Sequence, residues 1–105
     1  MAVIAMVSYD VSSLSAEFRE EMKAHHWTFT QNGQRLPLTT CVTFFNQAPM
    51  RDAQQVLTIV KKQIIAARDS VRAKHDKTFF IERFSVALFD GETAVLDGFG
   101  EPEKP

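Results

Sequence analysis

The sequence predicts a single α+β domain in which two helices cover one face of an antiparallel sheet. Segments of strand character alternate with two segments whose apolar residues recur every three or four positions, the spacing of a helix with one buried face. Two tight-turn signals, Asn32-Gly33 and Asp90-Gly91, mark hairpins. The 105 residues, 45% of them hydrophobic, are enough for one core.

The first two elements are a buried strand and a helix. Residues 2–10 are almost wholly apolar and predict the strand. The helix is expected over residues 14–26. Ser12 or Ser13 can cap it, because a serine hydroxyl accepts a hydrogen bond from a free N–H of the first turn. The side chains expected on its buried face are Leu14, Phe18, Met22 and His25.

The middle of the chain predicts two more strands. Residues 27–30 alternate aromatic and polar side chains, as a half-buried strand does, and the Asn32-Gly33 turn follows. Pro37 has no backbone N–H to donate, so it indicates an edge or a bulge. Residues 39–45 are rich in strand-forming side chains and are expected to pair centrally in the sheet.

The second helix is expected over residues 50–75. Pro49 suits its first turn, where a missing N–H costs nothing. The apolar stripe that should face the sheet consists of Ala53, Val56, Leu57, Val60, Ile64, Ala67 and Val71.

The end of the chain predicts two strands and a tail. Residues 78–89 form the longer strand, and the Asp90-Gly91 turn leads into a short one over residues 93–96. Glycines and prolines then indicate a flexible tail at 98–105, which leaves one domain over 1–97. The resulting order, β-α-β-β-α-β plus a last strand, is that of a ferredoxin-like fold.

One face of such a sheet stays uncovered by helices. The chain holds nine Phe, one Trp and one Tyr, more aromatic side chains than a single covered face needs. A second copy on the open face, or along the final strand, would bury the surplus. The sequence therefore predicts a homodimer.

Composition narrows the environment. The net charge is −1, which points to neither nucleic acid nor a membrane, and no apolar run approaches the roughly 18 residues of a membrane span. Residues 51–83, however, hold eight Lys or Arg against four Asp or Glu, which suits either an anionic partner or a solvated helix face. Cys41 is the only cysteine, so no intramolecular disulfide can form and a cytoplasmic location is expected.

Asp10 is the most distinctive residue of the first strand. It is the only acidic residue before Glu17, and it stands where a buried strand should reach the surface. A carboxylate there must be solvated, hydrogen-bonded or bound to a cation. It either caps the first helix or ligates a divalent cation that also holds a phosphate, and two copies across a dimer axis would make a better metal site than one.

Basic side chains form a narrow stripe along the second helix, beside its apolar face. Such a row can follow a phosphate backbone, although a solvated helix surface is the commoner explanation. The members of the stripe are Lys61, Arg68, Arg72 and His75.

Two other features favour structural roles. His25 and His26 point about 100° apart on a helix and lack a partner set with zinc spacing. Cys41 lies in a strand segment with no cationic cluster near it in sequence, and a core position is expected. The chain has no phosphate-binding glycine loop, nucleophile elbow or dinucleotide fingerprint.

Residues 7–12, Val-Ser-Tyr-Asp-Val-Ser, resemble the strand-one signature of the small CRISPR-associated adaptation nucleases and of the related virulence-associated protein D toxins. In those families an apolar strand ends in Tyr-Asp or Phe-Asp. The segments 41–45 and 70–85 are also similar to their third strand and to their second helix with the following strand. Cys41 in place of a serine, and the segment 32–40 with Pro37, depart from the pattern.

The resemblance implies a homodimer with paired Asp10 carboxylates, bound Mg²⁺ and hydrolysis of RNA or DNA. Tyr9, Arg19 and the basic stripe of Lys61, Arg68 and Arg72 would contact the nucleic acid, since Arg19 matches a basic position in the first helix of the family. A nucleic-acid-binding homodimer with metal-dependent endoribonuclease activity is therefore the first hypothesis. The alternative is a non-catalytic dimeric module that binds a protein or small ligand on its sheet face, and a small-molecule enzyme ranks last.

Overall fold

Strand β1 (Val3–Val11) lies at the centre of the fold, with strand β4 (Thr40–Phe45) on one side and strand β5 (Ile81–Phe89) on the other. Strand β6 (Ala94–Phe99) pairs with the outer side of β5. Every pair in this four-stranded sheet is antiparallel. The computed structural model describes residues 3–45, 53–89 and 94–99.

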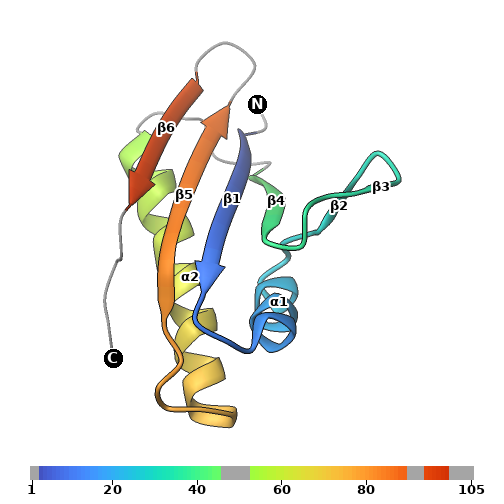
Figure 1. Ribbon diagram of the computed structural model, residues 1–105. Coiled ribbons are helices and arrows are strands. Elements are labelled where there is room, and N and C mark those ends of the chain that lie inside the picture. Colours follow the sequence, from blue (N-terminus) through green and yellow to red (C-terminus); the bar gives the residue numbers. More distant parts are fainter. Residues whose placement is uncertain (1–2, 46–52, 90–93, 100–105) are drawn as a thin grey trace.

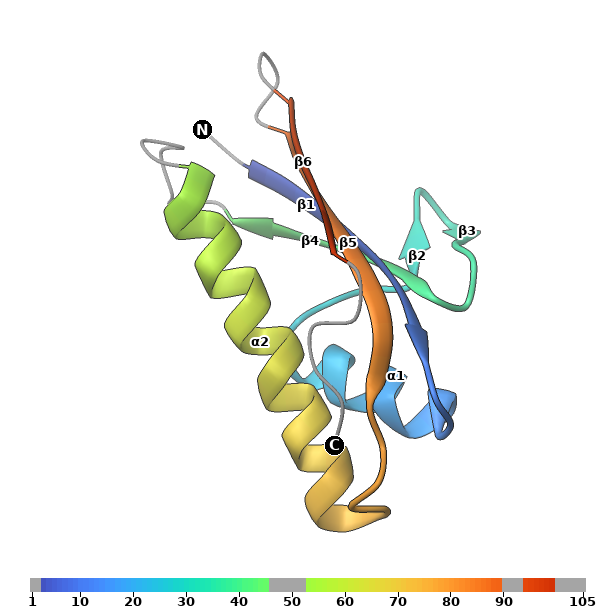
Figure 2. The ribbon, with the colours of Figure 1, turned by 60° about the vertical axis from the view of Figure 1, so that its left-hand side comes forward.

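Two helices and a small ribbon complete the described chain. Helices α1 (Ser15–Ala24) and α2 (Ala53–Lys74) both lie against the same face of the sheet, as Figure 2 shows. Strands β2 (Thr30–Gln31) and β3 (Gln34–Arg35) form a separate two-stranded ribbon that projects beside β4 (Figure 1). The predicted α+β class, with two helices and an antiparallel sheet, is confirmed.

The order of the strands differs from the prediction. Three strands, rather than two, lie between the helices. β4 is an outer strand of the four-stranded sheet, and not the central strand expected at 39–45. On its far side, among the described residues, Thr28 alone pairs with it, through a bridge to Val42, because the chain then turns away into the ribbon. β6 extends to Phe99, so the last strand includes two residues that the sequence placed in the tail.

The ribbon turns where the sequence predicts. Asn32 and Gly33 have φ values of 53° and 75°, the left-handed conformation that a two-residue hairpin turn requires. Asparagine and glycine adopt this conformation at little cost. Asp90-Gly91 lies outside the described residues, although the strands that it joins are paired from Phe89 and Ala94 onward.

Helix α1 starts without the predicted serine cap. The residue before it is Leu14, with φ 54° and ψ 41°, and no side chain caps the helix. Ser12 instead extends the pairing of β1 with the segment before β5. Its N–H donates to the Phe80 carbonyl oxygen at 3.0 Å, and its Oγ accepts from the Phe80 N–H at 3.0 Å. The cap prediction was wrong because this longer-range pairing engages the serine.

The core lies between the sheet and the two helices. Alternate residues of β1, namely Val3, Ala5, Val7 and Tyr9, are buried, and their neighbours point to the open face. Within the described side chains, the predicted stripe of α2 from Val56 to Val71 is also buried. Burying a large apolar side chain contributes roughly 1.5–3 kcal/mol, so this layer accounts for most of the stabilisation.

Two polar contacts hold the helices in place. Trp27, just after α1, donates its indole N–H to Gln63 Oε1 of α2 at 2.8 Å. Lys74 Nζ of α2 lies 2.9 Å from Glu21 Oε2 of α1. The Lys74 hydrogen bond, and a weaker contribution from Ser70, lower the pKa of Glu21 below its usual value. These contacts fix the position of α1, which carries part of the candidate site.

Candidate functional site

The open face of the sheet changes from apolar to charged along the strands. At one end Ile4 pairs with Phe44 of β4 and Phe89 of β5, and these side chains are 39%, 47% and 45% exposed. Ser8 and Ser85 are paired farther along, and the last pair on this face is Asp10 with Arg83. We call the exposed Ile4, Met6, Phe44 and Phe89 side chains the apolar patch.

Asp10 is neither a helix cap nor buried. Its Oδ2 accepts a hydrogen bond from Arg83 Nε at 2.7 Å, and the two side chains are 53% and 69% exposed. They border a shallow cavity of about 290 Å³ that Ser8, Thr39 and Ser85 also line. The structure therefore shows Asp10 as a solvent-exposed carboxylate that forms an ion pair with the Arg83 side chain.

The described surroundings of Asp10 in one chain supply a single carboxylate, and that carboxylate is paired with an arginine. Mg²⁺ requires an octahedral set of oxygen ligands, usually one or two carboxylates with several waters. Asp10 is the single carboxylate that lines its cavity in the described part of the chain, and Arg83 already neutralises it. Across residues 3–45, 53–89 and 94–99, no three His, Cys, Asp or Glu side chains are grouped as a metal site would need.

Tyr9 points away from Asp10 into the core. It is 3% exposed, and its ring packs edge-on against Phe18 at a centroid distance of 4.8 Å. Its hydroxyl donates to the Leu38 carbonyl oxygen at 3.5 Å. Burial raises the pKa of this hydroxyl well above its usual value, whereas the nearby Arg19 guanidinium acts in the opposite direction. In this position the Tyr9 ring supports the core and offers no face to a base.

The basic stripe of α2 is largely engaged within the protein. Arg68 is 6% exposed, and its guanidinium donates two hydrogen bonds to Asp69 Oδ1, at 2.8 and 3.0 Å. Arg72 Nε donates to the Phe79 carbonyl oxygen at 2.6 Å and closes the connection from α2 to β5. Lys61 is half-buried. The structure therefore does not bring these side chains together on one exposed surface.

His26 and Cys41 also have structural surroundings. The His26 carbonyl oxygen accepts a hydrogen bond from Thr43 Oγ1 at 3.0 Å, and its φ of 71° turns the chain after α1. Cys41 is fully buried, and burial raises the pKa of its thiol to about 12. A thiol that stays protonated at neutral pH is a poor nucleophile.

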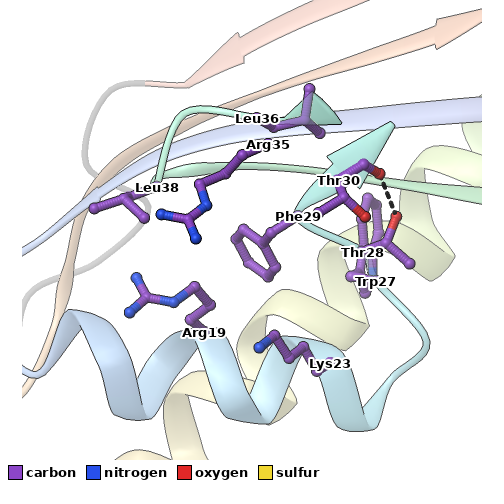
Figure 3. Close-up of a pocket in the computed structure, with 9 residues that line it drawn as sticks. All are labelled: Arg19, Lys23, Trp27, Thr28, Phe29, Thr30, Arg35, Leu36 and Leu38. Carbon is purple, nitrogen blue, oxygen red and sulfur yellow. Dashed lines mark hydrogen bonds between the residues drawn. The ribbon is translucent and has the colours of Figure 1, made fainter. Parts of the chain in front are cut away.

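Sequence reasoning missed a cavity between α1 and the ribbon. Its volume is about 590 Å³, and three cationic side chains, Arg19, Lys23 and Arg35, line it. Figure 3 shows the guanidinium groups of Arg19 and Arg35 pointing into the same space, next to the Phe29 ring. The other lining residues are Trp27, Thr28, Thr30, Leu36 and Leu38. We call this site the cationic cavity.

Local structure explains how the three cations come together. Arg19 and Lys23 are four residues apart in α1, so they lie on the same side of the helix. The Asn32-Gly33 turn reverses the chain and pairs Arg35 with Thr30, whose side chain lines the same cavity. The i,i+4 spacing and the hairpin signal are both visible in the sequence, but their closeness depends on how the ribbon packs beside α1.

The charge in the cationic cavity is not balanced locally. No acidic residue is among the described side chains that line it. Lys23 Nζ is 3.5 Å from Glu20 Oε1, an exposed i,i+3 pair whose contribution is small. Two guanidinium groups that share one space repel each other, and an anion placed between them would remove this cost.

Comparison with protein-family models, with curated proteins and with solved structures finds no match for the chain. No helix in the described part of the chain has both the length and the apolar character needed to cross a membrane.

Proposed function

We propose that the chain binds nucleic acid through its phosphate backbone. The observation that carries this proposal is the convergence of Arg19, Lys23 and Arg35 on one open cavity without a lining carboxylate. Arginine presents a planar fork of donors that matches phosphate oxygens, and lysine adds a point charge. Because the whole chain carries a net charge of −1, the cationic cavity is a local anion site on a protein without a general excess of positive charge.

Several cations near each other favour a polymer of phosphates over a single anion. Each phosphate that a cation neutralises releases a counterion, so the affinity of such a site falls steeply with salt. Contacts of this kind position a backbone without reading its sequence. Arg19, which the sequence already assigned to nucleic acid, is the one predicted contact residue that lies in the cationic cavity.

The test is the binding of a fluorescein-labelled 20-nucleotide RNA, followed by anisotropy at several salt concentrations. Arg19→Ala/Arg35→Ala should weaken binding at least tenfold and make the salt dependence shallower by about 0.7 per lost phosphate contact. The matched control is Lys62→Ala/Lys77→Ala, which removes the same charge from two exposed positions outside the cavity. Equal losses in both double variants would show that the cationic cavity is not the site.

The open face supports the homodimer that forms part of this proposal. The apolar patch places four large hydrophobic side chains at 39–47% exposure on the side of the sheet opposite the helices. A second copy turned by a two-fold axis would cover the patch, because the same surface of both copies meets in such an interface. The same patch favours the second candidate function, a non-catalytic dimeric module that binds a protein or small ligand on this face.

The ferredoxin-like assignment belongs to the same proposal. β4 and β5 flank β1, and both run antiparallel to it, with α2 connecting them across the covered face. This split β-α-β unit supports the assignment, and β6 would be the extra last strand. Hydrolysis of the bound backbone at Asp10 would require the carboxylate to leave Arg83, so the binding proposal does not depend on it.

A further inference from the structure

We infer that the cationic cavity holds an unpaired nucleotide of a single-stranded nucleic acid, with its phosphate on the arginines and its base against the apolar wall. This inference rests on the proposed backbone binding and adds the class of nucleic acid. The added step depends on apolar side chains of the cavity rather than on its cationic ones, namely Phe29, Leu36 and Leu38.

The cavity has two chemically distinct sides. Arg19, Lys23 and Arg35 supply positive charge, whereas the exposed Leu38 and the half-buried Leu36, beside the largely buried Phe29, supply apolar surface. Leu38 is 58% exposed, the largest exposed fraction among the large hydrophobic side chains of the described chain. A site for phosphate alone has no use for this apolar surface. A nucleotide has both an anionic group and a flat base with apolar faces, so it matches both sides.

The size and shape of the cavity favour an unpaired base. Its volume of about 590 Å³ lies within the range of small-ligand sites, roughly 300–1,000 Å³. In a duplex, neighbouring base pairs cover the faces of each base, and a base reaches a pocket only after it is flipped out at a cost of a few kcal/mol. In a single strand the face is already available for packing on aromatic and apolar side chains.

Trp27 provides a reporter inside the site. It is the only tryptophan of the chain, it lines the cavity, and its indole N–H is held by Gln63 Oε1 at 2.8 Å. The Trp27 side chain is 1% exposed and fixed, so bulk solvent has little effect on its emission. A ligand that fills the cavity changes the environment next to the indole and should therefore change this emission. Binding elsewhere on the protein should leave that emission unchanged.

The experiment follows Trp27 emission while the full chain is titrated with three probes at one low salt concentration. The probes are a 10-nucleotide oligouridylate, an abasic deoxyribose-phosphate oligomer of the same length, and a 10-base-pair duplex. The oligouridylate should bind about tenfold tighter than the abasic oligomer, the usual contribution of one packed base, and should alone change the Trp27 emission strongly. The duplex should bind with an affinity similar to that of the abasic oligomer and should likewise leave the Trp27 emission nearly unchanged.

Leu38→Ser should remove most of the preference for the oligouridylate while leaving the affinity for the abasic oligomer within twofold. Ile59→Ser is the matched control, since Ile59 is 44% exposed on α2, outside the cavity lining, and this variant should keep the preference. Equal affinity of the wild-type protein for all three probes would overturn the inference but leave backbone binding intact. Failure of every probe to bind would overturn the proposed function as well.

Discussion

Arg83 Nε donates a 2.7 Å hydrogen bond to Asp10 Oδ2 across the β1–β5 pair, between residues that are 73 positions apart in the sequence. The carboxylate that looked like a lone acid at the end of an apolar strand thus has a cationic partner in the same chain. Both side chains are more than half exposed, so the pair is surface electrostatics and contributes little to folding.

Asp10→Asn should therefore leave the protein folded and nearly as stable. An exposed ion pair contributes about 0.5 kcal/mol, which corresponds to a change of roughly 2–4 °C in the midpoint of thermal unfolding. If the nuclease hypothesis holds, the same variant should abolish cleavage of a single-stranded RNA in the presence of Mg²⁺. Cleavage by the wild type and Asp10→Asn at the same rate would exclude Asp10 as a catalytic residue. Arg83→Gln serves as the control that breaks the pair but keeps the carboxylate.

Arg72→Ala should destabilise the protein rather than alter an exposed binding surface. Its Nε holds the Phe79 carbonyl oxygen at 2.6 Å, and removing it leaves that acceptor without the donor. The expected loss is about 1–3 kcal/mol in the free energy of unfolding, measured with urea. The exposed Lys77→Ala, five residues later, should change it by less than about 0.5 kcal/mol. Unchanged stability with weaker RNA binding would instead make Arg72 a contact residue.

Stability should fall at alkaline pH. Burial raises the pKa of Cys41 from 9.0 to about 12 and that of Tyr9 above 10. The folded chain therefore retains protons that the unfolded chain releases, so the stabilisation is complete below about pH 8 and declines above pH 9. Each group contributes a slope of at most about 1.4 kcal/mol per pH unit.

Urea unfolding at pH 8, 9 and 10 measures this slope. Cys41→Ala should be less stable than the wild type at pH 8 because a buried side chain is shortened, but its stability should depend less on pH between 9 and 10. Identical pH dependence in the two proteins would mean that the Cys41 thiol is not shielded from water as the structure shows.

Ile4→Lys should convert the proposed dimer to a monomer. Ile4 lies between Phe44 and Phe89 in the apolar patch, so a charge there would meet its own copy across a two-fold axis. Sedimentation equilibrium at micromolar concentrations measures the mass directly. Ile59→Lys, at a position of similar exposure on α2, is the control and should leave the dimer unchanged. If the wild-type protein has the mass of a single chain, the apolar patch does not bind a second copy. The patch would then be a site for a different protein or a ligand.

The elements that the sequence predicted well are those whose pattern is local. The apolar stripe of α2 and the Asn32-Gly33 turn each express a single period or a single backbone conformation. By contrast, β1 was expected as a buried strand, whereas its residues alternate between the core and the open face. The predicted serine cap of α1 was wrong, because Ser12 instead forms two hydrogen bonds with Phe80, 68 residues away. A helix cap is predicted from residues close in sequence, so such a prediction does not include a hydrogen-bond partner as distant as Phe80.

The candidate site was predictable only in part, for the same reason. Arg19 was predicted as a contact residue only through the family resemblance, whereas Arg35 belongs to the segment 32–40, which departs from that family's pattern. Arg35 lines the cationic cavity only because the ribbon folds back beside α1, and no periodic pattern in the sequence predicts that tertiary contact. Conversely, the basic stripe of α2 satisfied helical spacing, yet Arg68 and Arg72 bind groups of their own chain.

The central position of β1 has a consequence for the order of folding. Its pairing with β4 joins residues 32–42 positions apart, whereas its pairing with β5 joins residues 70–85 positions apart and must wait for that later segment. During synthesis, β1, α1 and β4 can therefore associate while one edge of β1 is still unpaired. Contacts over long sequence separations form slowly, so this edge of β1 stays unpaired until β5 has been made. Closing it with β5 is the step that brings Arg83 to Asp10.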